Sequence, residues 1–353
     1  MASAFVDSAQ SAVEQAIQRN LKGLGYLASP APVLGASSKD VIVSRGPMRL
    51  YHYHPLTDEI YRVPVLLVMA TTNRGYIFDM VPGQSLVEFL LLRGYDVFML
   101  DWEAPRPEDR ALGMKDYVED FVGSAIAEVQ RTTGESDVSL VGYCMGGVLS
   151  VLWSGLNHAL GPKNLAVFTT PVDFHKMALF RNWSDPRYFD VDKLVDTLGM
   201  APADMLLAAF DMLRPAGRAS AQFALLDNLW SEEFVKAHRM FDRWSNDMLP
   251  LAGEYFRDTV KQLTWDNALV EGTMRIGGRR VELDRISCPF LHVTAEHDHI
   301  VTTDASAPLI GMIGSDNKEQ VVLKGGHVSL IAGPNAVRRM WPKLDHWLGE
   351  KSV

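Results

Sequence analysis

The chain has very little cysteine and no long run of one charge. Its 353 residues include two cysteines, Cys144 and Cys288. Two cysteines do not make a disulfide framework, so we expect reduced thiols in a cytosolic protein. The 34 Lys and Arg residues against 43 Asp and Glu residues leave a formal net charge of -9. Since phosphate neutralisation needs clustered positive charge, this composition argues against a nucleic-acid-binding protein.

Long apolar runs are also missing. No run approaches the roughly 20 residues of a membrane-spanning helix, so no membrane span is expected. The segment Met1–Asp7 has no basic stretch followed by an apolar core, so we expect no secretory signal. A hydrophobic content of 47% in 353 residues allows a large core. We therefore expect an intracellular protein with one large domain carrying an insertion, or with two modest domains.

Apolar runs alternate with helical patterns along much of the chain. Val65–Met69 is a continuous apolar run, which is typical of a parallel strand buried on both faces, and Asp96–Leu100 is predicted to be the next buried strand. The segment Gln84–Arg93 between them has a helical pattern, and Lys115–Arg131 has another. Strands that alternate with helices predict an α/β fold, with a mostly parallel sheet and helices on both faces.

The pattern divides the chain into three parts. Residues 1–37 are expected to form an N-terminal helical arm, because apolar positions recur at helical spacing before a Pro/Gly/Ser-rich segment. A hairpin-like pair, 40–44 and 48–53, follows it. The core is expected over residues 38–170 and 273–353. Residues 171–272 interrupt the strands with a mostly helical insertion, which we interpret as a cap or lid over the carboxyl edge of the sheet.

The segment Gly142-Tyr143-Cys144-Met145-Gly146 is the most informative motif. It follows an apolar run and precedes a small-residue stretch, as the G-x-S-x-G nucleophile elbow of α/β-hydrolases does, with cysteine in place of serine. A thiol nucleophile forms a thioester with an acyl group, and passing that group to an alcohol is downhill. Cys144 therefore favours acyl transfer over ester hydrolysis, whereas a packed structural thiol is the alternative.

A cysteine nucleophile needs a base and a group that orients the base. Asp298 follows a predicted strand over 290–294, and His327 follows one over 321–323. The order Cys144, Asp298, His327 is the order nucleophile, acid, histidine of α/β-hydrolases, so these three residues are the predicted catalytic triad. Other nearby residues compete for the acid and base positions: Glu296, Asp304, His292, His297 and His299.

The remaining site residues are predicted from their positions near the motif. The oxyanion hole is expected to use the backbone N–H of Met145 and a second N–H from Ala70 or Thr71, in the loop after the strand Val65–Met69.

Asn73 in this loop, Trp244 in the insertion and His299 beside Asp298 are the expected substrate-binding residues. A core tryptophan is the alternative for Trp244. The histidines around Asp298 lack metal-ligand spacing, so no metal and no cofactor are expected.

Several blocks together resemble the polyhydroxyalkanoate synthases, specifically the catalytic subunit of the two-component classes III and IV. The matching blocks are 85–102, 142–147, 170–174, 298–300 and 325–327. The resemblance implies an α/β-hydrolase fold, with Cys144 as nucleophile beside Asp298 and His327. It also implies a second, smaller non-catalytic subunit, because 353 residues leave no room for the long N-terminal extension of the single-subunit classes. A homodimer is expected by resemblance alone.

The activity implied by this resemblance is polymerisation of (R)-3-hydroxyacyl-CoA into a polyester, with release of CoA. The expected substrate is the short-chain 3-hydroxybutyryl form, and the expected location is the cytoplasm, at the surface of polyester granules. A thioesterase or polyhydroxyalkanoate depolymerase of the same fold is the alternative. A non-catalytic granule-associated protein with an inactive triad is a third interpretation.

Overall fold

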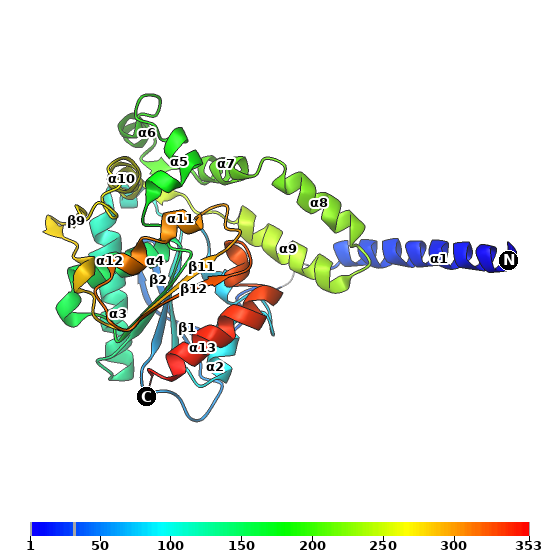
Figure 1. Cartoon of the computed structure of the whole chain (residues 1–353), viewed down its shortest axis with the longest axis horizontal. Helices are drawn as coiled ribbons and strands as arrows, with labels where there is room; N and C mark the ends of the chain where they lie inside the picture. The colour runs from blue at the N-terminus through cyan, green and yellow to red at the C-terminus, as the bar shows by residue number, and fades with distance from the viewer. Residues whose placement is uncertain (1, 31–32, 353) are drawn as a thin grey trace.

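An eight-stranded sheet forms the centre of the molecule (Figure 1). The computed structural model describes residues 2–30 and 33–352. The strand β2 (Met48–Tyr53) is antiparallel to its neighbours β1 (Lys39–Arg45) and β4 (Val97–Trp102), and the other pairs of this sheet are parallel. A mostly parallel α/β sheet was the prediction, and it is confirmed. In spatial order the strands are β1 (Lys39–Arg45), β2 (Met48–Tyr53), β4 (Val97–Trp102), β3 (Val65–Val68), β5 (Ser139–Tyr143), β6 (Asn164–Phe168), β11 (Phe290–Ala295) and β12 (Lys318–Leu323).

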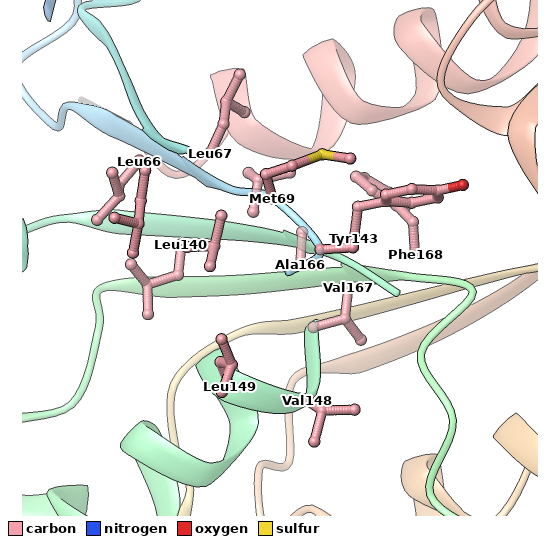
Figure 2. Packing of buried hydrophobic residues seen from close by; sticks show 14 of the residues in the cluster. Leu66, Leu67, Met69, Leu140, Tyr143, Val148, Leu149, Ala166, Val167 and Phe168 are labelled. Atoms are coloured by element: carbon pink, nitrogen blue, oxygen red, sulfur yellow. The ribbon is translucent and has the colours of Figure 1, made fainter. Parts of the chain in front are cut away.

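The central strands are buried because helices cover both faces of the sheet. Every residue of β3, β4, β5 and β6 is buried. The helices α2 (Leu86–Leu92) and α13 (Trp341–Gly349) lie on one face, and α3 (Gly123–Thr133) and α4 (Met145–Leu156) lie on the other (Figure 1). Figure 2 shows Val148 and Leu149 of α4 beside strands that carry Leu140 and Val167. Apolar side chains on both faces account for the continuous apolar runs of the sequence.

A long insertion separates β6 from β11. It holds two short strands that pair with each other, β7 (Met200–Ala201) and β8 (Leu251–Ala252). A second short pair follows, β9 (Arg275–Ile276) and β10 (Arg279–Arg280). The action of this insertion as a cap stays a prediction. Its helices are α5 (Ala178–Trp183), α6 (Val191–Leu198), α7 (Ala203–Leu213), α8 (Gly217–Asp227), α9 (Glu232–Asn246) and α10 (Gly253–Asp258).

The N-terminal arm is one long helix, α1 (Ala2–Leu27), which projects from the rest of the molecule in Figure 1. Where α1 meets the insertion, Arg19 Nη2 donates a hydrogen bond to the carbonyl of Asp227 at 2.8 Å. Residues 1, 31 and 32 of the predicted arm, and residue 353 of the predicted core, lie outside the described residues. No helix of the described chain is long and apolar enough to cross a bilayer.

Two short helices, α11 (Thr303–Ser306) and α12 (Leu309–Met312), follow β11. They connect β11 to β12, which are parallel. Asp298 lies in the loop after β11 and His327 in the loop after β12, so each loop begins at the carboxyl end of its strand. Since β5 ends at the same edge, the topology brings Cys144, Asp298 and His327 to one side of the sheet.

Candidate active site

Cys144 stands at the sharp turn between β5 and α4. Its backbone has φ 53° and ψ -121°, a conformation that non-glycine residues rarely adopt. The turn is held by a hydrogen bond of 2.9 Å from the Cys144 N–H to the carbonyl of Phe168 on β6. A backbone strained in this way persists only where its surroundings enforce it, and such positions cluster at functional sites.

Two glycines of the motif are required by close packing. A Cβ atom at Gly142 would lie 2.5 Å from Gly147 Cα, and one at Gly146 would lie 2.1 Å from the carbonyl oxygen of Val68. Both distances are far shorter than any real Cβ contact. The first turn of α4 therefore packs directly on the end of β3, as a nucleophile elbow requires.

His327 and Asp298 form a buried hydrogen-bonded pair. The Nδ1–H of His327 donates to Asp298 Oδ2 at 2.7 Å, and their side chains are 5% and 0% exposed. The other carboxylate oxygen, Oδ1, accepts the N–H groups of Ile300 at 2.8 Å and Val301 at 2.9 Å. With all of these bonds made, the carboxylate is fixed and the Nε2 atom of His327 is left free to face another group.

The Cys144 sulfur lies close enough to His327 to change its protonation. Burial by itself lowers the pKa of His327, but the charge of Cys144, hydrogen bonds to Cys144 and Asp298, and the charge of Asp298 outweigh it and raise the pKa to about 10. The imidazole therefore holds two protons at neutral pH, beside a sulfur atom. This arrangement can support a thiolate and imidazolium pair, the reactive form of a cysteine nucleophile.

Four of the competing acids and bases, His292, His297, Glu296 and Asp304, do not join this arrangement. His292 is buried on β11, where its Nε2 lies 2.9 Å from Ser306 Oγ. His297 and Glu296 are exposed and lie 4.0 Å apart, and Asp304 is exposed on α11. Of the sequence candidates, the structure brings Cys144, Asp298 and His327 together.

The three candidate residues of the oxyanion hole, Met145, Ala70 and Thr71, differ in their position relative to the cavity. Met145 is the first residue of α4, where a backbone N–H has no partner within the helix. Ala70 lines the same cavity as Cys144, and its N–H donates to no acceptor in the described part of the chain. Thr71 is buried and turns its hydroxyl away to Tyr255 Oη, at 3.3 Å. Ala70 lines the cavity and Thr71 does not, which favours the Ala70 N–H as the second donor; this assignment stays a prediction.

Cys144 opens into a cavity of about 650 Å³. Asn73, Trp244 and His299, the three predicted substrate-binding residues, line it. Trp244 is 7% exposed and its Nε1–H donates to the carbonyl of Arg74 at 2.9 Å, so it is both a packed residue and a wall of the cavity. Helices α7, α8 and α9 of the insertion supply much of the remaining lining. The cavity therefore lies between the sheet edge and the insertion.

Two further residues of the cavity were not predicted from the sequence. Arg214, between α7 and α8, lines it near His299; burial, and then the charge of Arg214, lower the pKa of His299. Tyr143 also lines it, with its ring 5.1 Å from the His327 ring. The Tyr143 hydroxyl is buried and has no hydrogen-bond partner among the described residues. A signal for Tyr143 was present, since it is part of the motif itself, whereas nothing local pointed to Arg214.

No group of three or more His, Cys, Asp or Glu side chains in the described chain is arranged to hold a metal ion. The chemistry that the residues of this cavity can perform is nucleophilic attack by sulfur, with a histidine that holds or supplies a proton and backbone N–H groups that can bind an oxyanion.

Fold and site together define an α/β-hydrolase-fold protein with cysteine at the nucleophile position. The alpha/beta hydrolase fold family model matches residues 64–334, and a model of the poly-beta-hydroxybutyrate polymerase N-terminus matches residues 33–90. Similar solved structures include a soluble variant of monoglyceride lipase from Saccharomyces cerevisiae, with a TM-score of 0.56 at 14% identity over 92% of this chain and all of the lipase. Another is BpoC of Mycobacterium tuberculosis, with a TM-score of 0.53 at 13% identity over 88% of this chain and 98% of BpoC.

Proteins of similar sequence show to which family within the α/β-hydrolase fold the chain belongs. The chain is 32% identical over 321 residues to the poly(3-hydroxyalkanoate) polymerase subunit PhaC of Allochromatium vinosum, covering 90% of both proteins. It is 29% identical over 324 residues to the same-named subunit of Haloferax mediterranei, where it covers 90% of this chain and 65% of the relative. The chain therefore belongs to the poly(3-hydroxyalkanoate) polymerase family, as the sequence blocks indicated.

Proposed function

We propose that this chain is the catalytic subunit of a polyhydroxyalkanoate synthase and joins (R)-3-hydroxyacyl groups from CoA thioesters into a polyester. The observation that carries the proposal is the position of Cys144 at the end of β5, beside the buried pair of His327 and Asp298 and open to a cavity. The family membership supports the same activity. The 3-hydroxybutyryl thioester is the proposed substrate.

In the first step, His327 holds the proton of Cys144 and the thiolate attacks the carbonyl carbon of the CoA thioester. The N–H groups of Met145 and Ala70 bind the oxygen that becomes negative in the tetrahedral intermediate. The bond from carbon to the CoA sulfur then breaks, and the CoA thiolate takes the proton from His327. The products of this step are free CoA and an acyl group on Cys144.

In the second step, the 3-hydroxyl of a growing chain or of a second monomer attacks the Cys144 thioester. His327 takes the hydroxyl proton, an ester bond forms, and the sulfur leaves as a thiolate. The Asp298 side chain is 0% exposed, and its two oxygens accept hydrogen bonds from His327, Ile300 and Val301. This supports a role for Asp298 in orienting His327 and not in touching the substrate.

Polymerisation requires that the hydroxyl, and not water, accepts the acyl group. The insertion forms one wall of the cavity, which supports its role as a cap that limits water. We propose that Asn73, Trp244 and His299 contact the bound acyl-CoA or the polyester.

The relatives from Allochromatium vinosum and Haloferax mediterranei are named as subunits. We therefore propose that this chain works with a second, non-catalytic subunit. We also propose that it forms a homodimer and that it binds the surface of polyester granules in the cytoplasm.

The test is to mix the purified chain with (R)-3-hydroxybutyryl-CoA, with and without the second subunit, and to measure CoA and polymer. A synthase releases CoA and forms insoluble polyester. Release of CoA with only free 3-hydroxybutyrate would instead support the thioesterase alternative.

Two cysteine variants make a matched pair for this experiment. Cys144→Ala is expected to abolish CoA release. Cys288→Ala is expected to keep it, because burial raises the pKa of the Cys288 thiol to about 12 and leaves it unreactive. Unchanged turnover in Cys144→Ala would exclude a Cys144 acyl-enzyme and would favour the non-catalytic interpretation of this site.

A further inference from the structure

The loop after β3 is tied to its surroundings on both sides of Ala70. On one side, the N–H of Met69 donates to the carbonyl of Leu100 at 3.1 Å, and the Met69 carbonyl accepts the Nε1–H of Trp102 at 2.9 Å. On the other side, the carbonyl of Thr72 accepts the N–H of Leu249 at 2.8 Å. The backbone of this loop is therefore held from two directions.

A buried tyrosine adds a third attachment. Thr71 Oγ1 donates to Tyr255 Oη at 3.3 Å, and Tyr255 is completely buried. The Tyr117 ring stacks on Tyr255 with centroids 4.1 Å apart and also packs on Trp102 at 5.0 Å. Trp102, Tyr117 and Tyr255 thus form one buried aromatic stack. Its two outer members contact the residues immediately before and after Ala70.

Of Ala70 and Thr71, it is Ala70 that lines the cavity into which Cys144 opens. The Ala70 N–H has no acceptor in the described part of the chain. The close approach of Gly146 to Val68 and to the Met69 carbonyl brings the first turn of α4 against the same loop. The Met145 N–H and the Ala70 N–H therefore belong to two segments that pack directly on each other.

We propose that the aromatic stack positions the Ala70 N–H for the oxyanion that forms on the substrate carbonyl. Trp102 and Tyr255 are positioning residues, because they act through Met69 and Thr71. The proposal rests on the proposed function and deepens it. Oxyanion donors are effective only when they are already oriented, so a shift of the loop weakens the transition state more than substrate binding.

The test uses Tyr255→Phe, which removes only the hydroxyl and keeps the ring in the stack. The substrate is (R)-3-hydroxybutyryl-CoA, and the rate of CoA release is followed. We expect kcat to fall about tenfold while KM stays within about twofold, because the lost interaction acts in the transition state.

A second reaction separates the oxyanion from the nucleophile. Iodoacetamide alkylates Cys144 at a saturated carbon, so no oxyanion forms in that reaction. The alkylation rate of Tyr255→Phe is expected to match that of the wild type. An equal slowing of alkylation and of CoA release would overturn the proposal, since it would mean a general disturbance of Cys144. Unchanged kcat in Tyr255→Phe would also overturn it.

Two more variants complete the design. Thr71→Val breaks the same hydrogen bond from its other end, so its effect on kcat should not add to that of Tyr255→Phe. Tyr95→Phe is the matched control, because the hydroxyl of this buried tyrosine donates to the Asp345 carbonyl at 2.9 Å, away from the cavity. It is expected to leave kcat unchanged. Additive effects of the first two variants would contradict the proposal.

Failure of the proposed function would look different. In that case the wild-type protein itself would release no CoA, or Cys144→Ala would release as much as the wild type. A wild-type protein that releases CoA through Cys144, combined with an unaffected Tyr255→Phe variant, would exclude only the positioning role of the aromatic stack.

Discussion

His327 Nδ1 lies 2.7 Å from Asp298 Oδ2, and neither side chain is more than 5% exposed. The residues come from two loops that follow neighbouring parallel strands, β11 and β12. A buried carboxylate in this position sets the tautomer of the imidazole, since its oxygen accepts only from a protonated Nδ1. The atom of His327 that can exchange a proton with Cys144 or the substrate is therefore Nε2.

Replacing Asp298 with asparagine tests this relationship. The amide has nearly the shape of the carboxylate but can present an N–H to Nδ1, which favours the wrong tautomer and removes a charge. We expect kcat for CoA release to fall by about 100-fold or more. Alkylation of Cys144 is expected to slow as well, in contrast to Tyr255→Phe. A loss smaller than about threefold, in a variant that melts like the wild type, would contradict an orienting role for Asp298.

The raised pKa of His327 leads to a prediction about Cys144→Ala. Burial lowers the pKa of His327, whereas Cys144 and Asp298 raise it to about 10, so the wild-type ring keeps its second proton between pH 6.5 and about 10. Without the sulfur, that proton is expected to leave at a pH at least about one unit lower. The His327 ring signals in an NMR titration measure this.

The same titration contains its own control. Burial alone lowers the pKa of His292 to about 4. Its signals should therefore be identical in the wild type and in Cys144→Ala. An unchanged His327 titration in the variant would mean that the sulfur does not interact with the ring.

Much of the architecture can be predicted from the sequence because it depends on local patterns. The segments Val65–Met69 and Asp96–Leu100 were predicted to be strands, and they coincide with the buried strands β3 and β4. The sharp turn at Cys144 could be predicted from its flanking glycines, which the close packing of the turn requires. Asp298 and His327 could be assigned because each follows a strand and because the chain order is that of α/β-hydrolases. The contact between them agrees with that assignment.

Other features depend on residues far apart in the sequence. Thr71 is one example, because its hydroxyl hydrogen-bonds to Tyr255, which lies 184 positions away in the sequence. Similarly, His292 is not available as a catalytic base, because its Nε2 is hydrogen-bonded to Ser306 Oγ inside the protein. No local pattern predicts such long-range pairs. The motif includes the position of Tyr143, but it does not predict that the Tyr143 hydroxyl is buried without a described partner.

Asp101 predicts a pH-dependent stability. Burial raises its pKa from 3.8 to about 6, although its Oδ1 accepts the N–H groups of Gly75 at 2.7 Å and Trp102 at 2.8 Å, which lower it. A carboxyl with a raised pKa in the folded state contributes stability that is complete below its unfolded pKa and is lost as pH rises through the folded value. The ionised carboxylate thus costs stability above about pH 6.

Asp101→Asn keeps an oxygen for both N–H groups but cannot ionise. The variant's gain in stability over the wild type is expected to be about 2 kcal/mol larger at pH 7.5 than at pH 4, with stability measured as a larger free energy of unfolding. Denaturant unfolding of both proteins at the two pH values measures this difference. A difference between the proteins that is the same at both pH values would show that the Asp101 carboxyl titrates normally.

Tyr143 and Tyr95 predict opposite results for the same chemical change. The Tyr143 hydroxyl is buried without a described partner, whereas the Tyr95 hydroxyl donates to the Asp345 carbonyl at 2.9 Å. Removing an unpaired buried hydroxyl costs little, so Tyr143→Phe should change the free energy of unfolding by less than about 0.5 kcal/mol or increase it. Removing a bonded one loses that hydrogen bond, so Tyr95→Phe should lose about 1 kcal/mol. Denaturant unfolding compares the two variants, and a larger loss in Tyr143→Phe would mean that its hydroxyl has a partner in the folded protein, such as a buried water.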